Sequence, residues 1–304
     1  MNKPAISSRT FDLMVQGRRL EIQRIEIRRS ETGAPTGSPA PELVFLHEGL
    51  GSISLWKDFP ARVAAATGCP ATVYSRYGHG NSDPLTEPRP VRFMHDEALQ
   101  SLPDLLAQLH IENPLLIGHS DGGSIALIFA GSNQAGSNQA GSNQAGPSHA
   151  GSAIAGANCR VRGLVLLAPH VFVEDLSIAS ISQAKLNFQA TNLPEKLARH
   201  HRDAARTFRG WNDIWLHPDF RAWNIEEYLP SIRCPILAIQ GFDDEYGTMA
   251  QVQAIAAKSG GPVEILALEN CRHSPHRDQP DAVLQAITKF VAHVSGNNDD
   301  SSGV

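Results

Sequence analysis

"PLLIGHSDGGS", residues Pro114 to Ser124, joins an apolar run to a run of small residues. The apolar run predicts a strand that ends near Ile117, and the small residues after Ser120 predict the start of a helix. Between them, the segment GHSDG matches the pattern G-x-S-x-G, in which a serine occupies a sharp, strained turn from strand to helix. Its two glycines remove side chains that would collide where strand and helix approach. The pattern therefore predicts an exposed Ser120 hydroxyl at a helix N-terminus, which favours developing negative charge.

A carboxylate and an imidazole follow two later apolar runs. The first run ends in Gly241-Phe242-Asp243-Asp244, and the second is followed by Asn270-Cys271-Arg272-His273. Because the carboxyl ends of parallel strands meet at one edge of a sheet, Asp244 and His273 can converge on Ser120. A serine hydroxyl needs such a histidine to take its proton, and a carboxylate holds the imidazole in the right tautomer.

The three motifs, in the order serine, acid, histidine, resemble those of α/β-hydrolase-fold proteins, in particular the capped bacterial hydrolases. The resemblance implies an α/β fold with a mostly parallel central sheet flanked by helices, and a helical cap inserted after the strand that ends near residue 168. By motif, Ser120 matches the nucleophile, Asp244 the acid and His273 the base. Three other residues are alternatives: Asp243 and Glu245 for the acid, and His276 for the base.

The same resemblance predicts how the chain is divided. Residues 1–172 and 230–296 would form the core and residues 173–229 the cap. The segment 131–158 opens with three perfect GSNQA repeats. Since small polar residues cannot offset the entropy lost on ordering, we expect this insert to be a flexible surface loop. We also expect a disordered tail at 297–304.

A glycine-containing loop follows the apolar run that ends near Leu46. The stretch VFLHEGLGS resembles the family's strand-then-His-Gly loop, which supplies one backbone N–H of the oxyanion hole. The resemblance assigns this N–H to Gly49, with Leu50 as the alternative, and the second N–H to Asp121. Glu48 departs from the pattern, because glycine is common at that position. Its carboxylate is a candidate for binding a polar group of the substrate.

Three of the four tryptophans lie in the expected cap, where aromatic rings suit an apolar pocket. We predict that Trp211 and Trp215 contact substrate, although packing between cap helices is the alternative for any single ring. His170 follows an apolar run and is either a substrate contact or a hinge residue bonded to backbone. The sequence pattern places three other histidines on the surface: His200, His201 and His217.

Composition narrows the class of protein. A net charge of −5 argues against nucleic acid as a partner, which demands a basic face. Four widely spaced cysteines indicate neither a metal site nor a disulfide framework, and favour a reduced compartment. No run approaches the ~20 apolar residues of a membrane span, and no secretory leader is visible. We therefore expect a cytoplasmic monomer or homodimer that acts on a small molecule without metal or cofactor.

These observations predict a serine hydrolase that cleaves a small carboxylic ester or lactone through an acyl-enzyme on Ser120. Serine at this position disfavours the dehalogenase and epoxide-hydrolase branches, which carry aspartate there. A C–C bond hydrolase of ring-cleavage diketones is the enzymatic alternative, but Ser274 stands where such enzymes commonly have tryptophan. A non-catalytic ligand receptor on the same fold is the alternative outside enzymes.

Overall fold

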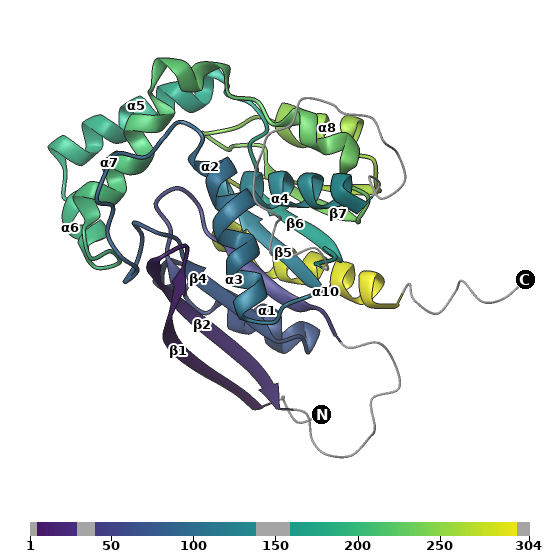
Figure 1. Cartoon of the computed structure of the whole chain (residues 1–304). Coiled ribbons are helices and arrows are strands. Elements are labelled where there is room, and N and C mark those ends of the chain that lie inside the picture. Colours follow the sequence, from purple (N-terminus) through teal and green to yellow (C-terminus); the bar gives the residue numbers. More distant parts are fainter. Residues whose placement is uncertain (1–4, 29–39, 138–158, 297–304) are drawn as a thin grey trace, which may run out of the picture.

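The computed structural model describes residues 5–28, 40–137 and 159–296. Its centre is an eight-stranded sheet with the order β1-β2-β4-β3-β5-β6-β7-β8 (Figure 1). The strands are β1 Ala5–Val15, β2 Arg18–Arg28, β3 Glu42–Leu46, β4 Ala71–Ser75, β5 Pro114–His119, β6 Gly163–Leu167, β7 Ile236–Gly241 and β8 Val263–Leu268. Strand β2 pairs antiparallel with β1 and with β4, and all other neighbours are parallel. The expectation of a mostly parallel sheet is confirmed.

Helices flank both faces of this sheet and also form the segment between β6 and β7. They are α1 Phe59–Thr67, α2 Phe93–Asp96, α3 Leu102–Gln108, α4 Asp121–Ser137, α5 Asp175–Ala190, α6 Leu193–Ala198, α7 Ala204–Trp215, α8 Met249–Lys258, α9 Pro275–Asp278 and α10 Pro280–Gly296. Shorter turns are the 3₁₀ segments η1 Ile53–Trp56, η4 Pro218–Ala222 and η5 Glu226–Ser231, and the π-helical η2 Glu97–Ser101. Apolar residues of α1 and α10 pack on one face, and those of α3, α4 and α8 on the other.

The central strands are apolar throughout because both faces are buried. Along β3, Leu43 and Phe45 belong to the core under α1 and α10, whereas Val44 and Leu46 belong to the opposite core. All four side chains are fully buried. This period of two is the geometry of a strand, and double burial explains why such strands lack the polar alternation of a half-exposed sheet.

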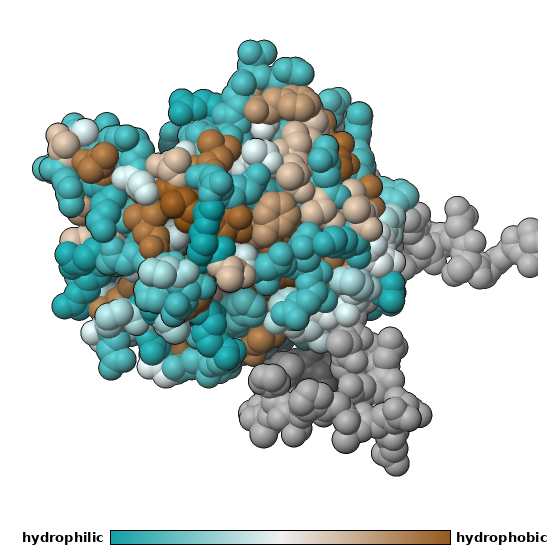
Figure 2. Space-filling view, turned by 90° about the horizontal axis from the view of Figure 1, so that it is seen from above, coloured by the Kyte–Doolittle hydropathy of each residue, from teal (hydrophilic) through white to brown (hydrophobic). Residues whose placement is uncertain are grey.

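A helical segment separates β6 from β7, as expected for the cap. Helices α5, α6 and α7 gather on one side of the molecule (Figure 1). Helix α7 begins at a side-chain cap, because Asp203 accepts a hydrogen bond from the Arg206 N–H. Its apolar face, which includes Phe208, Trp211 and Trp215, is buried. Seen from above, apolar residues are interspersed with polar ones on the molecular surface (Figure 2).

The expectation of a flexible loop is wrong for residues 131–137 of the repeat, because α4 continues to Ser137. Extending an existing helix costs far less than nucleating one. Gly131 also permits close packing, since a Cβ there would lie 2.5 Å from the Tyr228 carbonyl oxygen in η5. The rest of the insert, 138–158, and the expected tail, 297–304, lie outside the described residues. None of the described helices is long and apolar enough to cross a membrane.

Candidate active site

Ser120 occupies the turn between β5 and α4. Its φ is +52°, in the left-handed region that is costly for residues with a side chain. The flanking glycines make this turn possible. A Cβ on Gly118 would lie 2.4 Å from the Gly122 carbonyl oxygen, and a Cβ on Gly122 would lie 2.1 Å from the Leu46 carbonyl oxygen. The Ser120 N–H donates to the Leu167 carbonyl at 2.9 Å, which fixes the strained turn to β6.

The structure brings Ser120, Asp244 and His273 together. Nε2 of His273 lies 3.0 Å from the Ser120 Oγ, and Nδ1 lies 2.9 Å from each carboxylate oxygen of Asp244. Asp244 follows β7 and His273 follows β8, so both come from the carboxyl ends of parallel strands. The arrangement can move a proton from a serine hydroxyl to an imidazole that a carboxylate orients.

The alternative acids and base lie elsewhere. Asp243 is exposed. Glu245 forms an ion pair with Arg272 at 3.2 Å and accepts the His273 backbone N–H at 3.4 Å. His276 is buried beside Trp56, with ring centroids 5.0 Å apart, and burial holds its pKa well below the usual value. None of the three takes part in the Asp244–His273–Ser120 chain of hydrogen bonds.

Neighbouring groups set the charges of the acid and the base. Burial opposes ionisation of Asp244, but His273 and the hydrogen-bond donors around the carboxylate lower its pKa overall. Those donors include the Gln240 amide at 2.7 Å and the Tyr246 N–H at 2.8 Å. Burial also opposes protonation of His273, yet the Asp244 carboxylate raises the pKa of the imidazole. Sequence reasoning missed Gln240; its only signal is a polar residue within the apolar run of β7.

The loop after β3, residues 47–51, is called the β3 loop here. Four successive carbonyl groups in it accept hydrogen bonds. The Arg76 guanidinium donates to the carbonyl oxygens of His47, at 3.1 Å, and Glu48, at 2.9 Å. The next two carbonyl oxygens are bonded by histidines: that of Gly49 by His79 Nε2 at 3.0 Å, and that of Leu50 by His201 Nε2 at 2.9 Å. These bonds hold the peptide planes of the loop in one orientation. Gly49 lines the same cavity as Ser120, whose neighbour Asp121 begins α4. The first N–H groups of a helix have no partner within the helix.

The donors to the β3 loop were not found from the sequence. His201, expected on the surface, is buried with 6% of its area exposed. It lies between α6 and α7, and its Nδ1 accepts the Gly80 N–H at 3.0 Å. His79 is held neutral, since burial and the nearby Arg89 lower its pKa. Arg89 donates to its Nδ1 at 3.0 Å, which leaves the Nε2 hydrogen for the Gly49 carbonyl. Contacts between such distant segments leave no local pattern.

Ser120 and His273 open into a cavity of about 190 Å³. The four residues predicted to bind substrate all line it: Glu48, His170, Trp211 and Trp215. Tyr246, which sequence reasoning missed, lines it too. Trp215 has a second contact, because its indole N–H donates to the Asp121 carboxylate at 3.2 Å. Burial, followed by the neighbouring His273, lowers the pKa of His170 to about 3, so this imidazole is neutral at physiological pH.

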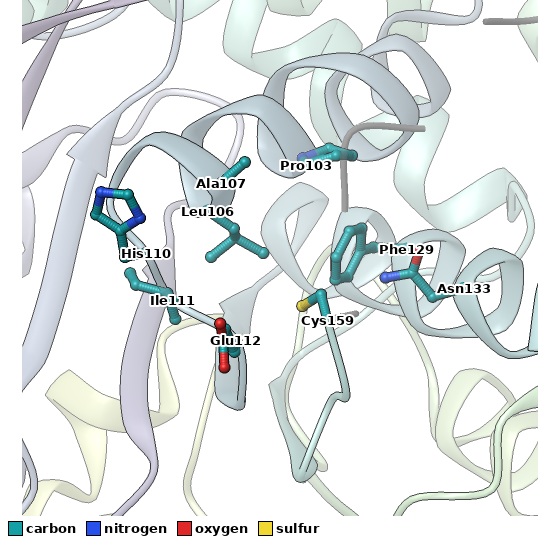
Figure 3. A pocket seen from close by; sticks show the side chains of 9 residues that line it. All are labelled: Pro103, Leu106, Ala107, His110, Ile111, Glu112, Phe129, Asn133 and Cys159. Carbon is teal, nitrogen blue, oxygen red and sulfur yellow. The ribbon is translucent and has the colours of Figure 1, made fainter. Parts of the chain in front are cut away.

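A second cavity, of about 130 Å³, lies between α3 and α4. Figure 3 shows Cys159 facing the helices that carry Leu106 and Phe129. Burial raises the pKa of the Cys159 thiol to about 12, so it is not a nucleophile at neutral pH. The cavity at Ser120 is therefore the candidate active site.

Comparisons with known proteins identify the family of the chain and agree with its fold. Residues 43–286 match the model of a family described as the alpha/beta hydrolase family. Among solved structures, proline iminopeptidase from Mycobacterium smegmatis superposes with a TM-score of 0.64 at 17% identity, covering 96% of this chain and 100% of that one. The enol-lactonase from Burkholderia xenovorans LB400 gives 0.62 at 17% identity, with 92% and 99% covered. Naproxen esterase from Bacillus subtilis gives 0.63 at 18% identity, with 94% and 92% covered. No curated protein matches the chain.

Proposed function

The chain belongs to the alpha/beta hydrolase family, and from this premise we propose that it is a serine hydrolase that cleaves a small carboxylic ester or lactone. The reaction proceeds through an acyl-enzyme on Ser120. The observation that carries the proposal is the continuous chain of hydrogen bonds from Asp244 through His273 to Ser120, at 2.9 and 3.0 Å, which ends in a cavity.

In the first half of the reaction, Ser120 Oγ attacks the substrate carbonyl while His273 Nε2 takes its proton. Asp244 stabilises the imidazolium that forms and remains ionised itself. The Gly49 and Asp121 N–H groups are assigned to the oxyanion of the tetrahedral intermediate. His273 then gives its proton to the leaving alcohol, and the acyl group stays on Ser120.

In the second half, His273 takes a proton from a water molecule, which attacks the acyl-enzyme carbonyl. The same two N–H groups stabilise the second oxyanion. Collapse of this intermediate breaks the bond to Ser120 Oγ, which recovers a proton from His273, and releases the carboxylic acid. The cap residues Trp211 and Trp215 line the cavity. Where bound substrate displaces water from it, the electrostatic interactions at the oxyanion become stronger.

The test is hydrolysis of a series of p-nitrophenyl esters, from acetate to octanoate, by wild type and Ser120→Ala. We expect multiple turnover by wild type and a loss of about 10⁶-fold in kcat in the variant. Labelling of Ser120 by a fluorophosphonate probe, read by mass spectrometry, provides an independent measure of the nucleophile. Absence of both turnover and labelling contradicts the proposal and favours a receptor.

A further inference from the structure

The cavity at Ser120 has an unusual balance of charge. Among its lining residues are two carboxylates, Glu48 and Glu245, and no lysine or arginine. The charge of Glu245 is compensated, because Arg272 forms an ion pair with it at 3.2 Å. Within the described residues, no lysine or arginine lies within ion-pair distance of Glu48. One carboxylate without a lysine or arginine partner therefore lines the space beside the nucleophile.

The Glu48 side chain folds back over the β3 loop. A Cβ on Gly51 would lie 2.2 Å from Glu48 Oε2, so only glycine leaves room for the carboxylate there. The side chain keeps 23% of its area exposed, and Glu48 lines the cavity. In the described part of the chain, no donor lies within hydrogen-bond distance of its oxygens. A carboxylate this shielded from water and lacking a donor favours a ligand that brings one.

His119 is the histidine that lies beside the Glu48 carboxylate. Its Nε2 bonds the His273 carbonyl at 2.7 Å, so this nitrogen carries the hydrogen. Its Nδ1 is buried, has no hydrogen-bond partner, and lies 3.8 Å from Glu48 Oε2. This separation is too long for a hydrogen bond, so His119 leaves the Glu48 oxygens open to a donor from a ligand.

Aromatic rings complete the surroundings of the carboxylate. A Cβ on Gly49 would lie 2.1 Å from the Trp211 ring, so the indole lies directly against the loop that carries Glu48. The Tyr246 ring is 6.5 Å from Trp211 and 4.7 Å from His273, measured between ring centroids. Aromatic faces attract cations through their quadrupoles, and more strongly where water is excluded.

We propose that the substrate of this site carries a positively charged nitrogen, which the Glu48 carboxylate and the rings of Trp211 and Tyr246 bind beside Ser120. The inference rests on the proposed serine hydrolase function and names its substrate class: a small ester with a cationic amine or quaternary ammonium group. Glu48 acts on binding and not on bond cleavage, because the proton transfers run through His273.

The test compares esters that differ only in charge. Acetylcholine and 3,3-dimethylbutyl acetate place the cation or its uncharged isostere in the alcohol. The ethyl esters of 4-trimethylammoniobutanoate and 5,5-dimethylhexanoate place it in the acyl group. For at least one pair, we expect wild type to prefer the charged ester in kcat/KM. Glu48→Gln should lower that preference by about 10- to 100-fold, the effect of a hydrogen-bonded charge.

The matched control is Glu264→Gln, the same chemical change at an exposed position on β8, which should retain the preference. If Glu48→Gln lowers kcat/KM equally for the charged and the uncharged ester of a pair, Glu48 only shapes the β3 loop. Preference of wild type for both uncharged esters likewise overturns the inference. In either case, turnover of the uncharged esters leaves the hydrolase proposal standing. Failure of that proposal is a different result: no turnover and no fluorophosphonate label on Ser120.

Discussion

At the scale of single residues, the charge on Asp244 governs the proton affinity of His273. Burial lowers the pKa of the imidazole, but the adjacent carboxylate raises it above its ordinary value of 6.5. The neutral imidazole is the form that accepts the Ser120 proton. We therefore expect kcat/KM to rise with pH through the pKa of His273 and to fall away below it.

Asp244→Asn tests this assignment. Loss of the negative charge removes the largest influence that raises the pKa of His273, so this pKa falls and the midpoint of the profile moves to lower pH. The rate should drop by about 10⁴-fold, as expected when the carboxylate partner of such a histidine is removed. The measurement is kcat/KM on a p-nitrophenyl ester from about pH 5 to 9. Asp243→Asn, at the exposed neighbour, should keep both rate and midpoint, and an unshifted midpoint in Asp244→Asn would contradict the assignment.

At the scale of elements, the junction of β5 and α4 depends on how closely two backbones approach. A Cβ on Gly122 would meet the Leu46 carbonyl oxygen at 2.1 Å, and neither group can rotate away. A Cβ on Gly123 would lie 3.1 Å from the Pro169 Cβ, its nearest neighbour, and no closer than 3.4 Å to any backbone atom. At Gly122 a side chain would therefore overlap backbone atoms, whereas at Gly123 it would only be tightly packed.

Gly122→Ala should thus destabilise the protein more than Gly123→Ala. Overpacking of this kind lowers the free energy of unfolding by about 1–3 kcal/mol. Because the new methyl group in Gly122→Ala would contact backbone, we expect its loss to lie at or above the upper end of this range. The urea midpoint of unfolding, followed by circular dichroism at constant m-value, measures the difference. Equal midpoints for the two variants would show that the strand and helix can separate at little cost.

At the scale of the whole molecule, residues of the cap form hydrogen bonds with the core segments that carry the candidate active site. His201, between α6 and α7, bonds the Leu50 carbonyl of the β3 loop, and Trp215 of α7 bonds Asp121 at the start of α4. Both contacts reach the segments to which the oxyanion N–H groups are assigned. Displacement of the cap would therefore disturb the reaction and not only the binding of substrate.

His201→Ala should lower kcat by about tenfold, the effect of one to two hydrogen bonds, with a smaller change in KM. His201→Gln retains an amide donor for the Leu50 carbonyl and should recover part of the loss. The side chain of the neighbouring His200 forms a hydrogen bond with the Ser54 hydroxyl, at 2.9 Å, and His200→Ala is the control. A change in KM alone, without an effect on kcat, would assign His201 to substrate binding instead.

Much of the architecture could be predicted because it follows from local patterns. The G-x-S-x-G segment specifies a strand, a turn and a helix by the sterics of a few adjacent residues. Apolar runs ending in Asp244 and before His273 place both residues at one edge of a parallel sheet. The sheet, its flanking helices and the insertion after β6 are confirmed. The extent of α4 could not be predicted from the repeat, whose composition favours a loop. Propagation of the existing helix and its packing against η5 stabilise the helical form instead.

The sequence by itself determined which residues can supply a nucleophile, an acid and a base, and in which order along the chain. Only the tertiary structure decided what holds them: Gln240 against Asp244, and Arg76, His79 and His201 against the β3 loop. Bonds from His79 and His201 to that loop join residues 30 and 151 positions apart. Contacts at such separations form only when the whole sheet and the cap have packed. They therefore leave no periodicity, spacing or motif in the sequence.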